Sequence, residues 1–485
     1  MKNKTLRDAV ERIDDDLIAE AGRARRARHF RWPAIASAAA CLAVFVCAAA
    51  FLPGLLAKQP NEIDLHGGGS GVPTTFPRPA QTTPPHPSDA GGNYQKLAAV
   101  SAVFPQSDRY SDRSIVDMNP VSGSFQQALN RFALRTASEV IDAEQNALYS
   151  PLSLYYALSL SAAGAQGNTQ AEMLALLGVS DAETLAEQCG NLYRLLYRDN
   201  SLSQLRIANS MWLQESAPFR GEYLQTAADD YYASLFSVDF SDAETGRAMA
   251  AWIADNTNGT LSYEYAPVSR QMMSLLNAVS FRAEWQDRFD SERTAQDLFT
   301  LASGETVACD FMNRRSVSHG FAKGDGFTRS SLALKNAGSM VFVLPDEGIS
   351  VGELLSSPEK IEECFFGGES GNGEVIWQIP KFSYHVSMSL SDTLQALGMT
   401  SAFDSALADF SGVSSEPLWI ADVSQDAHIA IDENGVVASA FTEILYAGAA
   451  MPEGSADMRL TRPFLYGIIV DGQLLFVGVC ANPAA

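Results

Sequence analysis

One uncharged apolar stretch divides this chain into parts with different physical requirements. Pro33–Ala57 runs for 25 residues without a charged side chain, and an α-helix needs about 20 such residues to cross a bilayer. Five arginines lie between positions 23 and 31, and Trp32 stands where a membrane interface is expected. The positive-inside rule keeps residues 1–32 in the cytoplasm and exports the chain beyond Ala57. We therefore predict a single-pass, uncleaved membrane helix over residues 33–57.

A cleaved signal peptide is the alternative for the same stretch. Ala48–Ala50 offers the small residues that a signal peptidase needs, and cleavage there would release a secreted protein. However, a charged leader of about 30 residues is long for a signal peptide, which favours the membrane helix.

Residues 58–93 have the composition of a linker. Gly67–Gly71 holds four glycines and a serine, and six prolines follow between positions 73 and 87. Glycine-rich segments are flexible and proline-rich segments are extended, so we expect a spacer between the membrane and the next domain. A proline-rich docking motif is the alternative, but no clean P-x-x-P with flanking basic residues supports it.

The remaining residues 94–485 are sufficient for one large folded domain. The chain is 46% hydrophobic and 19% charged, as expected of a globular protein. Ser124–Ala137 has helical periodicity, and Ser150 followed by Pro151 indicates the start of a second helix. Helices come early and strands come late without strict alternation, which predicts an α+β fold. The strand-like runs are Ser339–Leu344, Glu374–Ile379, Leu465–Val470 and Leu474–Val479.

Charge and cysteine content exclude some classes of partner. The chain has 34 Lys and Arg against 57 Asp and Glu, a net charge of −23, so nucleic acid is not an expected partner. Four of the six cysteines lie outside the apolar stretch, without C-x-x-C or zinc-type spacing. Buried free thiols are favoured for them, and one disulfide is the alternative. The four residues are Cys189, Cys309, Cys364 and Cys480.

The sequence contains no familiar catalytic motif. It lacks H-E-x-x-H, the G-x-S-x-G elbow, the phosphate-binding G-x-x-x-x-G-K-[ST] loop and G-x-G-x-x-G. We therefore expect no enzyme activity, no metal and no cofactor. An exported hydrolase stays a rival interpretation, because convergent active sites have no fixed sequence.

The segment from Ile431 to Ser455 is unusual for an ordinary domain. It begins like a strand and ends as a loop of small residues. Read at period two, one face of the strand is small or β-branched and uncharged, so a segment that should be a loop is patterned to become a buried strand. That face is formed by Val436, Ala438, Ala440 and Thr442. An edge strand followed by a turn is the simpler interpretation.

Eight motifs, in their order along the chain, resemble the serpin family of protease inhibitors. Each is weak alone, but the series is specific and covers residues 123–483. The motifs are N-A-L-Y-S-P-L-S-L at 146–154, G-A-Q-G-N-T at 164–169, A-N-S-M-W at 208–212, N-T-N-G at 256–259, N-A-V-S-F-R-A-E-W at 277–285, I-P-K-F at 379–382, A-D-F-S-G at 408–412 and R-P-F-L at 462–465. The resemblance implies N-terminal helices, three β-sheets and an exposed reactive loop.

The resemblance also assigns roles to single residues. Glu433 and Gly435 correspond to the family's hinge, and the inserting segment comprises Val436, Ala438, Ala440 and Thr442. The shutter, where the sheet opens, comprises Ser150, Ser153 and Asn277, and Trp285 corresponds to the breach, where insertion starts. Three positions depart from the usual family residues: Ala283, Gln425 and Val436.

The implied function is suicide-substrate inhibition of an extracytoplasmic serine protease by a bacterial-type, membrane-tethered monomer. The family's usual spacing from Glu433 puts the reactive bond at Ala449–Ala450, with Ala450–Met451 as second choice. Counting back from Pro463 points instead to the neighbourhood of Pro452, so the loop is longer than usual. An alanine as bait residue fits the shallow pocket of an elastase-like or subtilisin-like protease. The alternative is a non-inhibitory serpin-fold binding protein.

Overall fold

The computed structural model describes residues 93–105, 114–257, 259, 272–436 and 454–485. Thr83–Ala485 forms one compact unit. The predicted cytoplasmic segment, the membrane helix over 33–57 and nearly all of the linker lie outside the described residues. Among the helices within the described ranges, none is both long and apolar enough to cross a membrane.

Helices begin where the sequence provides caps. Ser150 caps the second long helix, with Pro151 in its first turn, as the sequence predicts. The preceding helix starts at Gly123 under a Ser122 cap and runs to Val140, slightly beyond the predicted range. The described helices are α3 Ser114–Met118, α4 Gly123–Val140, α5 Pro151–Gly164, α6 Gly167–Leu177, α7 Ala182–Leu196, α8 Gly221–Asp229, α9 Ala243–Asn256, α10 Val351–Leu354, α11 Pro358–Phe366 and α12 Ser391–Ala396, with 3₁₀ turns η3 Asn93–Leu97, η4 Ser291–Arg293 and η5 Ser401–Phe403.

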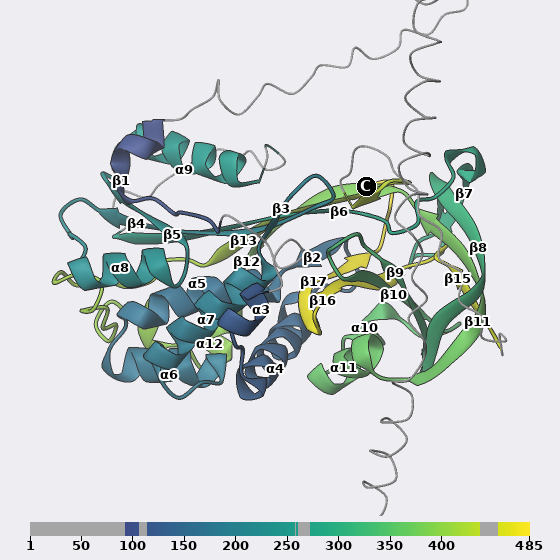
Figure 1. Ribbon diagram of the computed structural model, residues 1–485, viewed down its shortest axis with the longest axis horizontal. Coiled ribbons are helices and arrows are strands. Elements are labelled where there is room, and N and C mark those ends of the chain that lie inside the picture. The colour runs from purple at the N-terminus through teal and green to yellow at the C-terminus, as the bar shows by residue number, and fades with distance from the viewer. Residues whose placement is uncertain (1–92, 106–113, 258, 260–271, 437–453) are drawn as a thin grey trace, which may run out of the picture. The chain divides into compact units, whose positions relative to one another are not determined.

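The main sheet has the order β1-β5-β4-β6-β14-β13-β12, and β3 pairs with β4. All of its ladders are antiparallel except β4–β5. Figure 1 shows α5, α6 and α7 on one side of this sheet and α9 on the other. Its strands are β1 Ala98–Val100, β3 Arg198–Asp199, β4 Ser203–Gln214, β5 Ala233–Val238, β6 Met273–Glu284, β12 Phe382–Ser389, β13 Ser424–Ile431 and β14 Gly435–Val436.

The second sheet has the order β15-β11-β8-β9-β10-β16-β17-β2, and β7 pairs with β8. The four strand-like runs predicted from sequence all fall in its strands β10, β11, β16 and β17. Its strands are β2 Ala147–Tyr149, β7 Ala295–Thr300, β8 Thr306–Gly324, β9 Phe327–Ala333, β10 Ser339–Pro345, β11 Glu369–Pro380, β15 Ser455–Arg459, β16 Phe464–Val470 and β17 Gln473–Cys480.

The α+β fold is confirmed, and over the described residues its strands form two sheets where three were expected. The 19-residue strand β8 pairs with β7 near its start and with β9 near its end. Strand β11 follows β8 through most of that length. Because β8 pairs with β7, β9 and β11, hydrogen bonds join all four strands into the single second sheet.

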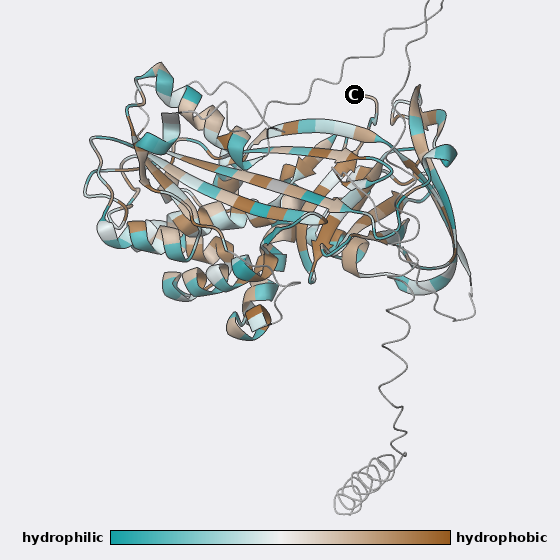
Figure 2. Ribbon diagram, turned by 45° about the horizontal axis from the view of Figure 1, so that its top comes forward, coloured by the Kyte–Doolittle hydropathy of each residue, from teal (hydrophilic) through white to brown (hydrophobic). Residues whose placement is uncertain are grey.

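Two apolar clusters hold the fold together. The larger fills the space between the two sheets and the helices α4 to α7, and Figure 2 shows brown and teal residues alternating along the long strands. The smaller lies under α9, around Trp212, Phe236 and Trp252. Tyr94 closes this cluster: its ring meets Phe236 edge-on at 5.9 Å and its hydroxyl donates to Asp255 Oδ2 at 2.7 Å.

Candidate functional site

A tight turn over Asp432–Gly435, here named the hinge turn, reverses the chain between β13 and β14. The Asp432 carboxylate accepts the backbone N–H groups of Asn434 and Gly435 at 2.8 and 3.2 Å. The Asp432 N–H in turn donates to the Gly435 carbonyl at 3.1 Å. An aspartate that satisfies the backbone two and three residues ahead stabilises such a turn. The chain therefore leaves β13 and returns beside it as β14.

Strand β14 lies between β6 and β13. Gly435 pairs with Glu284 and Val436 with Ala283 on one side, while Val436 pairs with Ile431 on the other. Over the described residues, β6 and β13 share no ladder of their own. The start of the predicted inserting segment thus already occupies a place between these two strands.

Gly435 is required by the close approach of two backbones. A Cβ atom at this position would lie 2.3 Å from the Ala283 carbonyl oxygen and 2.7 Å from the Glu284 Cα. Neither backbone atom can move aside without breaking the β14–β6 pairing. The next residue, Val436, is only 2% exposed and packs into the larger core cluster. The face that carries Val436 is therefore the buried face.

Trp285 fastens the hinge turn to the end of β6. Its indole Nε1–H donates to the Asp432 carbonyl at 2.9 Å, and its backbone N–H donates to the Asn434 carbonyl at the same distance. Phe289 N–H donates to the Glu433 carbonyl at 2.9 Å. The three carbonyls of the turn thus find donors in one short segment, as buried backbone groups require.

Glu433 connects the hinge turn to two further segments. Its carboxylate accepts the Thr294 hydroxyl at 2.7 Å and lies 3.1 Å from the Lys381 ammonium. Burial alone would raise the pKa of Glu433, but the hydrogen bonds from Thr294 and its own backbone, with the Lys381 charge, hold this pKa below its ordinary value. The side chain is therefore an anion at neutral pH.

The predicted shutter residues form two neighbouring groups beneath the main sheet. Gln425 on β13 accepts the Ser150 N–H at 2.7 Å and donates to the Ser150 carbonyl at 3.0 Å. Asn277 on β6 donates to Asn209 Oδ1 at 2.6 Å. The Asn277 Oδ1 and the buried Ser153 hydroxyl have no hydrogen-bond partner among the described atoms.

The structure brings some predicted residues together and leaves others outside its described ranges. Glu433, Gly435, Val436 and Trp285 meet at the hinge turn, and Ser150 meets the unusual Gln425. Asn277 and Ser153 lie within the described ranges, where Asn277 donates to Asn209. Six other predicted residues lie outside those ranges: Ala438, Ala440, Thr442, Ala449, Ala450 and Met451.

Sequence reasoning missed several participants. Thr294, Lys381 and Glu284 reach the hinge region from distant parts of the chain, and no local pattern indicates these contacts. Asp432 could have been found, because an Asp three residues before a Gly is a turn signal.

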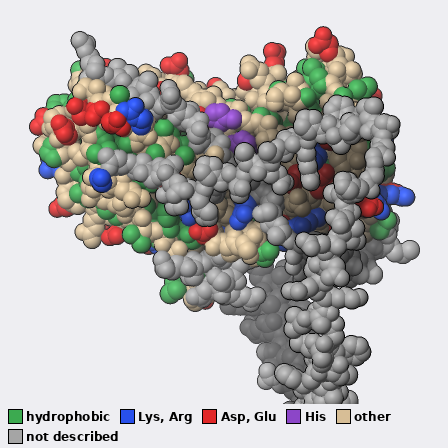
Figure 3. All heavy atoms as spheres, turned by 90° about the horizontal axis from the view of Figure 1, so that it is seen from above, with side chains coloured by type: hydrophobic (Ala, Val, Ile, Leu, Met, Phe, Trp, Pro, Cys, Tyr) green, Lys and Arg blue, Asp and Glu red, His purple; other side chains and the backbone are tan. Residues whose placement is uncertain are grey.

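The described residues hold no cluster of metal ligands, and their cysteines are buried. Within the described ranges, no three or more His, Cys, Asp or Glu residues lie together as metal ligands. The four described cysteines are buried free thiols, and burial raises the pKa of Cys189 and Cys364 to about 12, which keeps them unreactive. Figure 3 shows Asp and Glu side chains gathered at one end of this face, with Lys and Arg side chains scattered across it.

Comparisons with known proteins agree on one family. The family model described as serpin (serine protease inhibitor) matches residues 127–483. Serpin-Z1C of Triticum aestivum is 30% identical over 383 residues, which cover 73% of this chain and 95% of that protein. Serpin B6 of Pongo abelii is 28% identical and covers 70% of this chain and 94% of its own length.

Solved structures agree with this assignment. The thermophilic serpin tengpin in its native state has a TM-score of 0.68 at 29% identity, covering 80% of this chain and 100% of its own. Thyroxine-binding globulin with thyroxine has a TM-score of 0.65 at 23% identity, a likeness of fold alone. The relatives include plant, primate and archaeal proteins, so they do not assign a bacterial origin. Because the family model spans most of the chain, this protein belongs to the serpin family.

Proposed function

We propose that this protein inhibits an extracytoplasmic serine protease as a suicide substrate, by inserting its cleaved reactive loop into the main sheet. The observation that carries the proposal is the seating of β14 between β6 and β13, with Val436 buried on the core side. A loop that continued from β14 as a strand would therefore start in a fixed register with β6 and β13. The protein itself supplies no catalytic group to the reaction.

The register of β14 defines where an inserting strand would go. Continued along β6, it would pair residues 437–446 with residues 282–273. Val436 faces the core, so Ala438, Ala440 and Thr442 would follow it on the same face at period two. These side chains are small and uncharged, so burying them carries no large desolvation cost.

An inserting strand that kept this register would bring Thr442 to the proposed shutter. It would come level with Asn277 on β6 and with Gln425 on β13. Asn277 Oδ1 and the Ser153 hydroxyl have no partner among the described atoms, and a threonine hydroxyl both donates and accepts hydrogen bonds. Insertion would thus bring a hydroxyl level with Asn277, whose Oδ1 has no partner among the described atoms.

Ordinary protease chemistry supplies the rest of the mechanism. The target's serine attacks the bait carbonyl and forms an acyl-enzyme ester, and the cut releases the amino-terminal part of the loop, which can then add to the sheet as a strand. About ten new backbone hydrogen bonds at ~1 kcal/mol each, with the burial of Ala438, Ala440 and Thr442, would provide a driving force on the order of 10 kcal/mol. The attached protease moves with the strand and is distorted before water can hydrolyse the ester.

The first prediction concerns the inward face. Ala438→Arg should fold normally but convert the protein from inhibitor to substrate, because an unpaired charge would have to be buried during insertion. The measurement is the yield of SDS-stable complex with an elastase-like protease, against the yield of cleaved chain. Ser439→Arg is the matched control, since Ser439 belongs to the opposite face. Unchanged complex formation by Ala438→Arg would contradict loop insertion as the trapping step, and a wild-type chain that forms no complex would favour a non-inhibitory binding protein.

The second prediction concerns the bait bond. We place it at Ala449–Ala450, or next at Ala450–Met451, beyond residue 446, where pairing with β6 would end. An alanine side chain fits a shallow apolar pocket and cannot reach the buried carboxylate of a trypsin-type pocket. Mass spectrometry of the fragment released on complex formation should show a new N-terminus at Ala450 or Met451. A complex that forms only with trypsin-like proteases, or cleavage at Arg459, would contradict the assignment.

The third prediction concerns location. We propose that residues 33–57 anchor the protein in the membrane with the inhibitory domain outside. The proposal is based on the uncharged apolar run and on the arginines that precede it. Protease added to intact cells should then digest the chain after Lys58 and spare residues 1–30. A mature domain free in the medium, with an N-terminus near residue 51, would support the secreted alternative instead.

A further inference from the structure

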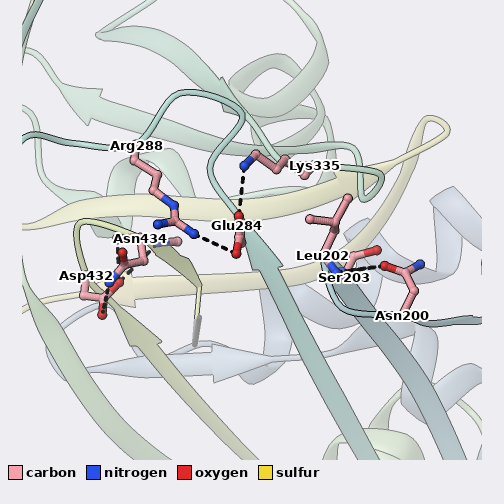
Figure 4. Close-up of polar contacts among 9 residues, drawn as sticks. Asn200, Leu202, Ser203, Glu284, Arg288, Lys335, Asp432 and Asn434 are labelled. Atoms are coloured by element: carbon pink, nitrogen blue, oxygen red, sulfur yellow. Dashed lines mark hydrogen bonds and ion pairs between the residues drawn. The ribbon is translucent and has the colours of Figure 1, made fainter. Parts of the chain in front are cut away.

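A buried carboxylate lies directly beside the hinge turn. Glu284, the last residue of β6, is only 3% exposed. Its two oxygens contact the Arg288 guanidinium at 2.8 Å and the Lys335 ammonium at 2.9 Å. Figure 4 shows Glu284 between these two cations, with Asp432 and Asn434 of the hinge turn nearby. A buried carboxylate needs such partners, because an unpaired charge is costly inside a protein.

Glu284 also joins three segments through its backbone. Its carbonyl accepts the Lys335 N–H at 2.8 Å, just after β9, and its N–H donates to the Leu202 carbonyl at 3.3 Å, just before β4. The neighbouring Gln286 N–H donates to the Ala333 carbonyl at 2.8 Å. The end of β6 is therefore attached to the second sheet by backbone bonds and by the Glu284–Lys335 ion pair.

The same residue faces the hinge. Glu284 is the register partner of Gly435. In the sequence Arg288 lies between Trp285 and Phe289. The backbone N–H groups of these two residues donate to carbonyls of the hinge turn. A shift of Glu284 would therefore change the β14–β6 pairing and the support of the turn together.

We propose that Glu284 is a positioning residue for loop insertion, acting through its ion pairs with Arg288 and Lys335. The two pairs hold the end of β6 in place, so that Gly435 and Val436 stay seated and the cleaved loop extends from a fixed register. Insertion competes with hydrolysis of the acyl-enzyme. If the end of β6 were less firmly held, insertion would be slower and more protease would be released by hydrolysis. This inference rests on the proposed function and adds to it the group that fixes the starting register.

The test measures how the reaction divides between cleaved chain and SDS-stable complex, in addition to the stability of each variant. Glu284→Gln, in the full chain with an elastase-like protease, should raise the ratio of cleaved chain to SDS-stable complex by about tenfold, which corresponds to ~1.4 kcal/mol between the two competing barriers. The rate of first cleavage should not change, because the bait bond is untouched. Lys335→Met removes one of the two pairs, so it should shift the ratio in the same direction by less. It also serves as the second variant if Glu284→Gln does not fold.

A control separates positioning from general weakening of the fold. Leu177→Ala removes a fully buried side chain at the end of α6, so it should lower stability without changing the partition. Glu284→Asp retains the charge and should restore part of the wild-type ratio. If the wild type traps the protease and the Glu284 and Lys335 variants give the same ratio of cleaved chain to complex as the wild type, the role of Glu284 is overturned. The proposed function then still stands. A wild type that yields only cleaved chain overturns the proposed function as well.

Discussion

The backbone hydrogen bonds between the hinge turn and the segment after β6 are the contacts on which the proposed mechanism depends. Trp285 and Phe289 bind all three carbonyls from Asp432 to Asn434, and Gly435 lies against the backbone of Ala283 and Glu284. These bonds fix one register for the chain that leaves the turn. Because side chains alternate along a strand, a slip of one residue would put Val437 and Ser439 in the core in place of Val436 and Ala438.

The arrangement of the main sheet fits a strand added between β6 and β13. Strand β12 pairs with β13 over eight residues, while β4 pairs with β6 over eleven. Each pair can therefore move as a unit, and Gln425 and Asn277 face the junction from the two sides. On the far face, α9 packs over β6. Under the proposed mechanism, insertion would add a strand between β6 and β13 while each keeps its other neighbour, and the energy released could then move an attached protease.

Local signals in the sequence predict local structure well. Ser150 and Pro151 start a helix as expected, and the four apolar runs are strands, because caps and side-chain periodicity act over a few residues. Val436, the one residue of the predicted inserting face that the structure describes, is buried, and the rest of that face stays a prediction. The ion pairs of Glu433 with Lys381 and of Glu284 with Lys335 join residues about 50 positions apart. No local pattern in the sequence indicates which of these distant charges will meet. The continuous second sheet was missed for the same reason, since the pairing of β8 with β11 depends on long-range register.

Thermal unfolding before and after loop cleavage tests the central claim most directly. The loop would be cut by a protease that the protein does not trap, and the cut chain compared with the intact one by calorimetry. If cleavage allows insertion worth on the order of 10 kcal/mol, the unfolding temperature should rise by about 10 °C or more. A cut chain that unfolds at or below the temperature of the intact protein would contradict insertion as the source of inhibition.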